Sequence, residues 1–564
     1  ATLAVAPTTP WTAPPQLPAD TNVLLITIDA LRADHVGAYG YKRATTPRLD
    51  ALARESTRFG DAWSHAPSTR YSIPAILSGR YPSTIATGLA HWPPNVLPEN
   101  RMLAEIMKDN GFYTAAFLSY YYFETGWGLN QGFDTYDYHL QTLHSGAGVN
   151  PARTSGTSSR QLADEVVDWI GKNRDKKFFV WTHFYDTHFD FERHPDMPES
   201  NFGNDEIDLY DGEIRFTDFH IGRVLDALKA AGVWDKTIVI VTSDHGDGFG
   251  EHGIPPDKRH GYHLYANETR VPLIVHIPGT APKVVMTPAG HIDIAPTLLN
   301  ALGIAQDKEP TLLGTSRLGL ITGATPDDKK GAIFQEVTYE GPSSRYNGTQ
   351  KRAIATTDWH FIRNLIPDGT SELYRRADDP LEEHDLAGTG QPAEKTLSAQ
   401  LAGWMDSIAL PPDFARRVAG NIATTPFAPK VALGDTIGGA LVLDGADLPD
   451  APVKRGQPFE VDLYWHAKQR LEPGWRLFMH VESSGGRMVN ADHDPVENTY
   501  PLSRLGPGTF LRDRVKVTLP FDFPRGPLRV RVGLFKGLDR APITTGAHAT
   551  RDHAVDVGGL TVQP

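Results

Sequence analysis

Three short apolar runs in the N-terminal half of the chain constrain its fold most strongly, because each one leads into a polar residue. They cover residues 22–28, 178–182 and 237–242, and the polar residues are Asp29, His183 and Asp244. These runs have the length of buried strands. Amphipathic helices are predicted between them, at 47–55, 102–110, 159–173 and 210–231. Such alternation is typical of a mostly parallel sheet with helices on both faces, where ligands bind beyond the carboxyl ends of strands.

The C-terminal part of the chain has a different texture. A smaller unit is predicted with strands at 354–364 and 371–374 and a closing helix at 395–405. From about residue 430, alternating segments at 459–465, 477–481, 515–519 and 528–535 are separated by Gly, Pro and Asp turns. This pattern predicts an antiparallel β-sandwich. We therefore expect four regions: a linker at 1–20, an α/β catalytic domain at 21–335, a small α+β C-terminal subdomain with its linker at 336–425, and a β-sandwich domain at 426–564.

Composition limits the classes of partner. The formal net charge of −13 lacks the basic footprint of nucleic-acid binding, so no nucleic-acid partner is expected. No run reaches the roughly 18 apolar residues of a membrane span. The first twenty residues are rich in Pro, Ala and Thr, and the chain starts at Ala1. We interpret these features as a linker of an exported protein, in the periplasm, on the cell surface or secreted, with a signal peptide or membrane tether upstream of residue 1. The alternative is a removed initiator methionine.

The polar residues at the predicted strand ends suit a metal ion. Asp29 and the adjacent pair Asp244 and His245 offer hard oxygen ligands and one imidazole, which Mn, Zn, Ca or Mg accept. The structural alternative for any one of them is a residue that caps a strand end. Their occurrence after successive strands, together with a histidine-rich loop, favours the metal site.

Two strings of residues carry a specific resemblance. Ser243-Asp244-His245-Gly246 is followed by Gly250-Glu251-His252-Gly253, and residues 66–82 contain the anchor Leu77-Ser78-Gly79. Their order resembles the sulfatase-type branch of the alkaline phosphatase superfamily over roughly residues 21–410. That branch includes phosphonate monoester hydrolases and lipoteichoic acid synthases. The resemblance implies an alkaline-phosphatase-like fold in which one divalent ion (Mn, Zn or Ca) is held by four residues: Asp29, Thr69, Asp244 and His245.

Thr69 stands where sulfatases keep the cysteine or serine that is oxidised to formylglycine. Oxidation of a threonine would give a ketone, and the chain has no cysteine. The position four residues later, an arginine in sulfatases, is Ile73. A hydroxyl on a metal can instead attack phosphorus and form a phospho-enzyme. We therefore expect phosphoryl chemistry with Thr69 as the nucleophile.

The resemblance also assigns the surroundings of the nucleophile. His183 and His260 are expected to act in catalysis, by contacting substrate and protonating the leaving group. Five further residues are expected to contact substrate: Arg70, Ser72, His188, His252 and His263. Ser72 is expected at the start of the helix that holds Thr69, with Pro74 in the first turn. Asp186 and His188 are two residues apart rather than four, which favours one metal over two.

Three functions remain open at this point. The first is a metal-dependent hydrolase, or phosphoryl transferase, acting on phosphate diesters or phosphonate or phosphate esters of small molecules, lipids or glycans. The second is a sulfatase that works without formylglycine. The third is a non-catalytic surface protein that binds glycan or envelope polymer.

Overall fold

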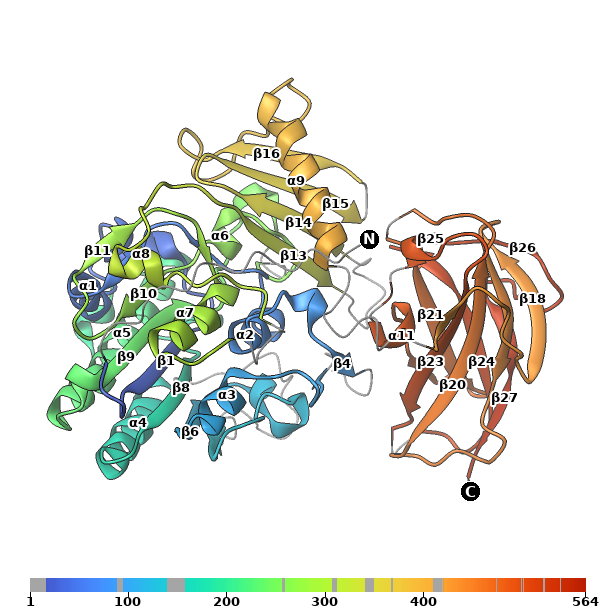
Figure 1. Ribbon diagram of the computed structural model, residues 1–564, viewed down its shortest axis with the longest axis horizontal. Coiled ribbons are helices and arrows are strands. Elements are labelled where there is room, and N and C mark those ends of the chain that lie inside the picture. The colour runs from blue at the N-terminus through green and yellow to red at the C-terminus, as the bar shows by residue number, and fades with distance from the viewer. Residues whose placement is uncertain are drawn as a thin grey trace.

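The computed structural model contains one large α/β unit, a small sheet covered by a helix, and a β-sandwich (Figure 1). It describes residues 17–88, 95–138, 158–255, 259–306, 312–339, 349–366, 369–408, 418, 420–472, 474–498, 500, 502–520, 523–537 and 539–563. The predicted linker at 1–20 lies mostly outside these residues. Among the helices described, none is both long enough and apolar enough to cross a membrane.

The large unit is built on a mixed sheet whose centre is β1 (Asn22–Ile28). β1 pairs in parallel with β8 (Phe178–Phe184) on one side and with β9 (Thr237–Ser243) on the other. The whole sheet has the strand order β11-β2-β10-β9-β1-β8-β6-β7. Its other strands are β11 (Lys283–Val285), β2 (Thr57–Phe59), β10 (Leu273–His276), β6 (Tyr113–Leu118) and β7 (Thr135–Asp137). Because β1, β8 and β9 are parallel neighbours, their carboxyl ends meet at one edge of the sheet.

Alternate residues of β1 bury two separate cores. Val23 and Leu25 belong to one apolar cluster, while Leu24 and Ile26 belong to the other. The first cluster includes side chains from α2 (Thr69–Ser78), α3 (Leu103–Asp109), α7 (Ile294–Ala301) and α8 (Leu318–Thr322). The second includes side chains from α1 (Pro47–Arg54), α4 (Ser159–Asn173) and α5 (Glu206–Ala230). The predicted sheet with helices on both faces is therefore confirmed, and both faces of β1 are buried as a central parallel strand requires.

Two element boundaries differ from the sequence expectation. β8 extends two residues beyond the predicted 178–182, so His183 lies inside the strand and pairs in register with Thr27. α5 begins at Glu206 rather than residue 210, because Asp205 and Asp208 form a capping box there.

The second unit is a four-stranded antiparallel sheet with one long helix against it. The strands are β13 (Ile333–Tyr339), β14 (Thr349–Ala355), β15 (Trp359–Ile366) and β16 (Ser371–Arg375), and the helix is α9 (Pro392–Ile408). The single strand predicted at 354–364 is wrong: Thr356 to Asp358 form a turn in which the Thr356 hydroxyl accepts the Trp359 N–H, so β14 ends and β15 begins within that range. The predicted limit at 335/336 falls inside β13, and the domain limits themselves stay predictions.

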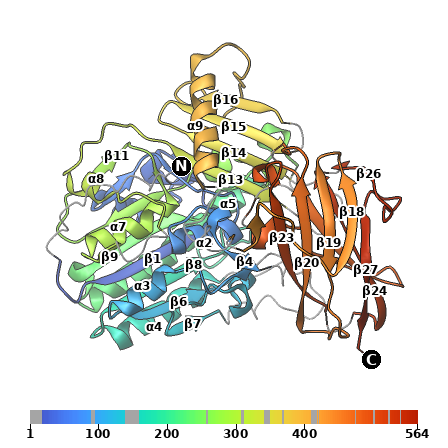
Figure 2. The same ribbon diagram turned by 45° about the vertical axis from the view of Figure 1, so that its right-hand side comes forward.

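The C-terminal unit is the predicted antiparallel sandwich; in Figure 2, β23, β20, β19 and β18 of one sheet follow one another from left to right. One sheet has the order β17-β23-β20-β19-β18-β26, and the other has β22-β21-β24-β25 with β27 also paired to β24. Their bounds are β17 (Ile422–Ala423), β18 (Val431–Ile437), β19 (Leu441–Asp447), β20 (Pro458–Ala467), β21 (Arg476–Ser483), β22 (Met488–Asn490), β23 (Phe510–Thr518), β24 (Gly526–Lys536), β25 (Asp539–Arg540), β26 (Ile543–Thr545) and β27 (Val555–Val562). Trp465 is fully buried in the core between the sheets and Trp475 packs against it, so both tryptophans serve packing.

Candidate active site

The carboxyl ends of β1 and β9 bring the predicted metal ligands together. Asp29 follows β1 and Asp244 follows β9, and the side chains of Asp29, Asp244 and His245 are completely buried. The backbone beyond the strands is fixed from both sides, since the Asp29 N–H donates to the Phe184 carbonyl and the Asp244 N–H to the Ile28 carbonyl. The sheet register therefore fixes the spacing of the two carboxylates.

Thr69 is the first residue of α2, and its hydroxyl reaches the same cluster. Its Oγ1 lies 3.2 Å from His245 Nε2 and 3.4 Å from Asp29 Oδ2. The side chain of Ser68 makes no capping hydrogen bond to the start of the helix. The expectation for the helix start was wrong in detail. Thr69 rather than Ser72 opens α2, and Pro74 lies in the second turn rather than the first.

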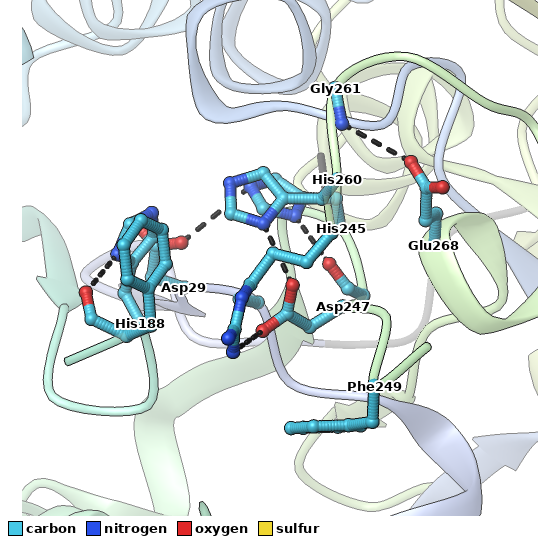
Figure 3. A network of polar contacts seen from close by, with 12 residues as sticks. Asp29, His188, His245, Asp247, Phe249, His260, Gly261 and Glu268 are labelled. Atoms are coloured by element: carbon cyan, nitrogen blue, oxygen red, sulfur yellow. Dashed lines mark hydrogen bonds and ion pairs between the residues drawn. The ribbon is translucent and has the colours of Figure 1, made fainter. Parts of the chain in front are cut away.

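The donor set fits a cation. Asp244 Oδ1 accepts the N–H groups of Ala30 and His245, whereas Asp244 Oδ2 and Asp29 Oδ1 are buried with no hydrogen-bond partner among the described residues. His245 Nε2 is 3.6 Å from each of these two open oxygens (Figure 3). Buried carboxylate oxygens are rarely left unpaired, and a divalent ion is one way to satisfy them. Asp29, His183 and Asp244 form a buried group whose donor atoms lie within 4.8 Å of one another.

Electrostatics supports the same interpretation. Burial and the neighbouring Asp244 carboxylate raise the pKa of Asp29 well above its usual range. Burial also opposes ionisation of Asp244, but the nearby His245 and His183 outweigh it and lower the pKa of that carboxyl. In metal-free protein the pair therefore tends to hold one proton, which a divalent ion would displace.

Ala30 supports the cluster through its backbone. It has a φ of 53°, in the left-handed region that residues with a Cβ rarely adopt. This conformation aims the Ala30 N–H at Asp244 Oδ1 over 3.1 Å. One oxygen of Asp244 is thus held by the main chain while the other stays open.

His183 lies within the carboxylate cluster rather than beside it. Its Nε2 is 3.3 Å from Asp29 Oδ2, its side chain is fully buried, and burial lowers its pKa to about 4. Its predicted part in protonating a leaving group stays a prediction. Its Nε2 and the Thr69 hydroxyl contact the same oxygen, Asp29 Oδ2.

His260 lies on the outer side of His245, with 4.7 Å between the ring centroids. Its Nδ1 is 2.8 Å from Asp247 Oδ1, a carboxylate that the sequence analysis did not select (Figure 3). Asp247 is completely buried. Burial opposes its ionisation, but the hydrogen bond to His260 and the nearby His260 and Arg259 together outweigh it and lower the pKa of Asp247. The sequence did offer a sign of this contact. Asp247 is an acidic residue two positions after His245, and the loop that follows it leads back to the site at His260, thirteen residues later.

His188 completes the inner wall. Its ring centroid is 5.0 Å from that of His260, and its Nδ1 lies 2.7 Å from the Phe189 carbonyl. Burial and the neighbouring His260 lower the pKa of His188 to about 3, so the ring is neutral at physiological pH. Asp186 points elsewhere: its carboxylate accepts the N–H groups of Ser158 and Ser159 at the start of α4. That carboxylate is therefore engaged in capping a helix.

The other four predicted substrate contacts lie in different surroundings. The Arg70 guanidinium lies 4.7 Å over the Tyr71 ring. Ser72 is fully buried, and its hydroxyl has no hydrogen-bond partner among the described residues. His252 and His263 both stack on Tyr265, at 3.7 and 5.7 Å. The roles of these four residues stay predictions.

The fold and this donor set define a class, the alkaline-phosphatase-like hydrolases. Within it, the family described as Sulfatase matches residues 21–304, half of the chain, and the chain belongs to that family. A second family, described as N-sulphoglucosamine sulphohydrolase, C-terminal, matches residues 250–408.

Relatives and solved structures agree with this assignment. The uncharacterized sulfatase YidJ of Escherichia coli strain K12 is 25% identical over 65% of this chain and 82% of its own length. The inner membrane protein YejM of Salmonella typhimurium is 27% identical over 50% of this chain and 41% of its own length. A crystal structure of the sulfatase yidJ from Bacteroides fragilis has a TM-score of 0.59 at 21% identity, covering 71% of this chain and 98% of the other. The phosphonate monoester hydrolase of Agrobacterium radiobacter has a TM-score of 0.51 at 19% identity, covering 69% and 94%. At these identities the structures establish the fold alone.

Proposed function

We propose that this protein is a metal-dependent hydrolase of phosphate diesters or phosphonate esters that uses Thr69 as its nucleophile. One observation carries the proposal. The Thr69 hydroxyl lies 3.4 Å from Asp29 and 3.2 Å from His245, beside two buried carboxylate oxygens that have no hydrogen-bond partner in the described part of the chain. A threonine cannot become an aldehyde, so the route by formylglycine is closed to this side chain. Its hydroxyl is nevertheless a competent nucleophile toward phosphorus.

The ion would be held by Asp29, Asp244 and His245, with Thr69 beside them. When bound, a divalent cation lowers the pKa of a neighbouring hydroxyl and offsets negative charge on substrate oxygens. Nucleophilic attack and proton transfer are carried out by side chains of the protein.

In the first step, Thr69 Oγ1 bonds to phosphorus while the bond from phosphorus to the leaving oxygen breaks. The hydroxyl proton of Thr69 is released to solvent water, because the Asp29 carboxylate beside it is needed as a ligand of the ion. His260 gives a proton to the leaving oxygen from Nε2, since its Nδ1 is held by Asp247. In the second step, water attacks phosphorus, His260 takes the proton of that water, the bond to Thr69 breaks, and Thr69 regains a proton from solvent water. An alcohol in place of water would make the enzyme a transferase.

The charge of the site favours a monoanionic substrate. Among the described residues, two guanidinium groups beside Asp247, those of Arg32 and Arg259, are already ion-paired with protein carboxylates. His183 and His188 are neutral at physiological pH. A phosphate diester or a phosphonate monoester carries one negative charge. A site with one divalent ion therefore suits these substrates better than it suits a phosphate monoester, which is a dianion.

The test is a turnover panel on purified protein with four substrates: p-nitrophenyl phosphate, bis(p-nitrophenyl) phosphate, p-nitrophenyl phenylphosphonate and p-nitrophenyl sulfate. Each is measured in chelator and with added Mn²⁺, Zn²⁺ or Ca²⁺, and Thr69→Ala and Thr69→Ser are the matched variants. We expect metal-dependent cleavage of the diester and the phosphonate, loss in Thr69→Ala and partial retention in Thr69→Ser. Mass spectrometry of the acid-quenched enzyme should find the p-nitrophenyl phosphoryl group from the diester, or the phenylphosphonyl group from the phosphonate, on Thr69.

Two results would refute the proposal. Sulfate cleavage by unmodified Thr69 without phosphate turnover would make the protein a sulfatase that uses a plain hydroxyl. Cleavage that persists in Thr69→Ala would place the nucleophile elsewhere.

A further inference from the structure

A chain of buried polar contacts leads from the interior of the sheet to the metal cluster. The Trp181 indole N–H donates to Thr27 Oγ1 over 3.0 Å. Thr27 Oγ1 lies 2.8 Å from His183 Nδ1, and His183 Nε2 lies 3.3 Å from Asp29 Oδ2. The side chains of Trp181, Thr27, His183 and Asp29 are all completely buried. We name Trp181, Thr27 and His183 the strand relay.

The register of the sheet creates this relay. Thr27 on β1 is the paired neighbour of His183 on β8, and Trp181 is two residues earlier on the same strand and the same face. The Phe123 ring meets the His183 ring edge-on at 4.8 Å, so the imidazole has little freedom to turn.

The hydrogen-bond inventory permits the tautomer of His183 that a metal ligand requires. An indole N–H can only donate, so one lone pair of Thr27 Oγ1 accepts from Trp181. The hydroxyl proton of Thr27 has an acceptor in the Thr182 carbonyl at 3.4 Å. The second lone pair is then free to accept an N–H from His183 Nδ1. In that arrangement every proton has a partner, and His183 Nε2 presents a lone pair to the carboxylate cluster.

A lone pair facing a carboxylate is favourable only if a cation lies between them. The open oxygens of Asp29 and Asp244 call for the same cation, and the donor atoms of Asp29, His183 and Asp244 lie within 4.8 Å of one another. His245 offers an internal comparison: its Nδ1 lies 2.7 Å from the Gly246 carbonyl, which leaves its Nε2 for the same cluster. Metal-binding histidines usually donate their second ring N–H to such an oxygen.

We propose that His183 is an additional ligand of the metal through Nε2, and that Thr27 and Trp181 are positioning residues that hold it in the required tautomer. This inference deepens the proposed function, since it concerns the same metal centre. Its test is metal binding in the absence of substrate, so it can fail or succeed independently of phosphate turnover.

The experiment compares Thr27→Val with Thr27→Ser, a pair that differs in the hydroxyl. Mn²⁺ affinity is measured by competition with a chelator, and the melting temperature is recorded with and without Mn²⁺. We expect Thr27→Val to lose about 10–100-fold in affinity, the range for residues that support a metal ligand, and Thr27→Ser to stay close to wild type. The melting temperature without metal reports any purely structural damage, because a structural role alone would leave the increment on adding Mn²⁺ unchanged.

A second measurement counts the ligands directly. Electron spin-echo envelope modulation of the Mn²⁺-loaded protein should detect two coordinated imidazole nitrogens in wild type, from His183 and His245, and one in His183→Asn. Unchanged Mn²⁺ affinity in Thr27→Val would overturn the positioning role of the relay. An unchanged nitrogen signal in a folded His183→Asn variant would overturn His183 as a ligand.

Discussion

Replacing Asp29 by Asn should stabilise the protein in the absence of metal and destabilise it relative to wild type in the presence of metal. In chelator, Asp29 is a fully buried carboxyl with one unpartnered oxygen and a second carboxylate beside it. Leaving a buried polar group unsatisfied costs about 1–3 kcal/mol. The neutral amide of Asn removes the charge that makes this arrangement unfavourable.

The size of the stability difference between wild type and Asp29→Asn should depend on pH. The pKa of Asp29 is raised in the folded state, so between about pH 4, where an unfolded aspartate titrates, and the raised folded pKa the folded protein holds the extra proton. The free energy of unfolding therefore falls as pH rises through this window, by up to about 1.4 kcal/mol per pH unit. Asp29→Asn lacks this contribution, so its advantage over wild type should grow from pH 5 to pH 7.

Added metal should reverse this difference, so that wild type becomes more stable than Asp29→Asn. An ion at 100 times its dissociation constant stabilises the folded state by about 2.7 kcal/mol. Wild type gains this stabilisation, and Asp29→Asn, which lacks a ligand carboxylate, should gain little of it. Because the chain has several structural units, the quantity to follow is the melting temperature of the transition that Mn²⁺ shifts. One kcal/mol corresponds to roughly 2–4 °C in a domain of 150–250 residues.

The matched control is Glu213→Gln on α5. Glu213 is also buried with a pKa raised by burial, but it contacts His194 and the Glu192 N–H rather than the metal cluster. Its variant should alter the pH slope and keep the full response to Mn²⁺. The reasoning is refuted if Asp29→Asn in chelator melts at or below wild type with the same pH slope.

Two further predictions separate the surroundings of the cluster. Asp247→Asn should reduce turnover by about 10²–10⁴-fold, because His260 loses the carboxylate that holds its ring for proton transfer. The rise in melting temperature on adding Mn²⁺ should be retained. An unchanged pH–rate profile would contradict this role of Asp247. Asp186→Ala should lower stability by about 1–2 kcal/mol through loss of the cap on α4 and leave Mn²⁺ stoichiometry intact; loss of bound metal in this variant would show that Asp186 is a ligand.

The sequence predicted the parts of the site that follow from strand ends. Asp29 and Asp244 come directly after apolar strands, so parallel pairing alone brings them to one edge of the sheet. Thr69 was located by its distance from the Leu77-Ser78-Gly79 anchor, and the structure places its hydroxyl beside Asp29.

The contacts that the sequence could not predict depend on which elements become neighbours. The contact of Thr27 with His183 requires knowing that β1 lies next to β8, in one particular register. The spacing of Asp186 and His188 argued against a second metal but left Asp186 without a role, and its oxygens cap a helix that starts 27 residues earlier in the chain. The strand predicted at 354–364 failed because its apolar pattern continues on both sides of a turn that Thr356 stabilises.

Four histidines surround the cluster, and the partner of each Nδ1 distinguishes them. His183 contacts the Thr27 hydroxyl and His245 the Gly246 carbonyl, so both can present an Nε2 lone pair to a cation. His188 contacts the Phe189 carbonyl and lies beyond the carboxylates, where a neutral ring can accept a hydrogen bond from substrate or water. His260 alone is backed by a carboxylate, which stabilises an imidazolium. A site with one such histidine has one group suited to deliver a proton to a leaving oxygen and recover it from water, as a phosphoryl-enzyme cycle on Thr69 requires.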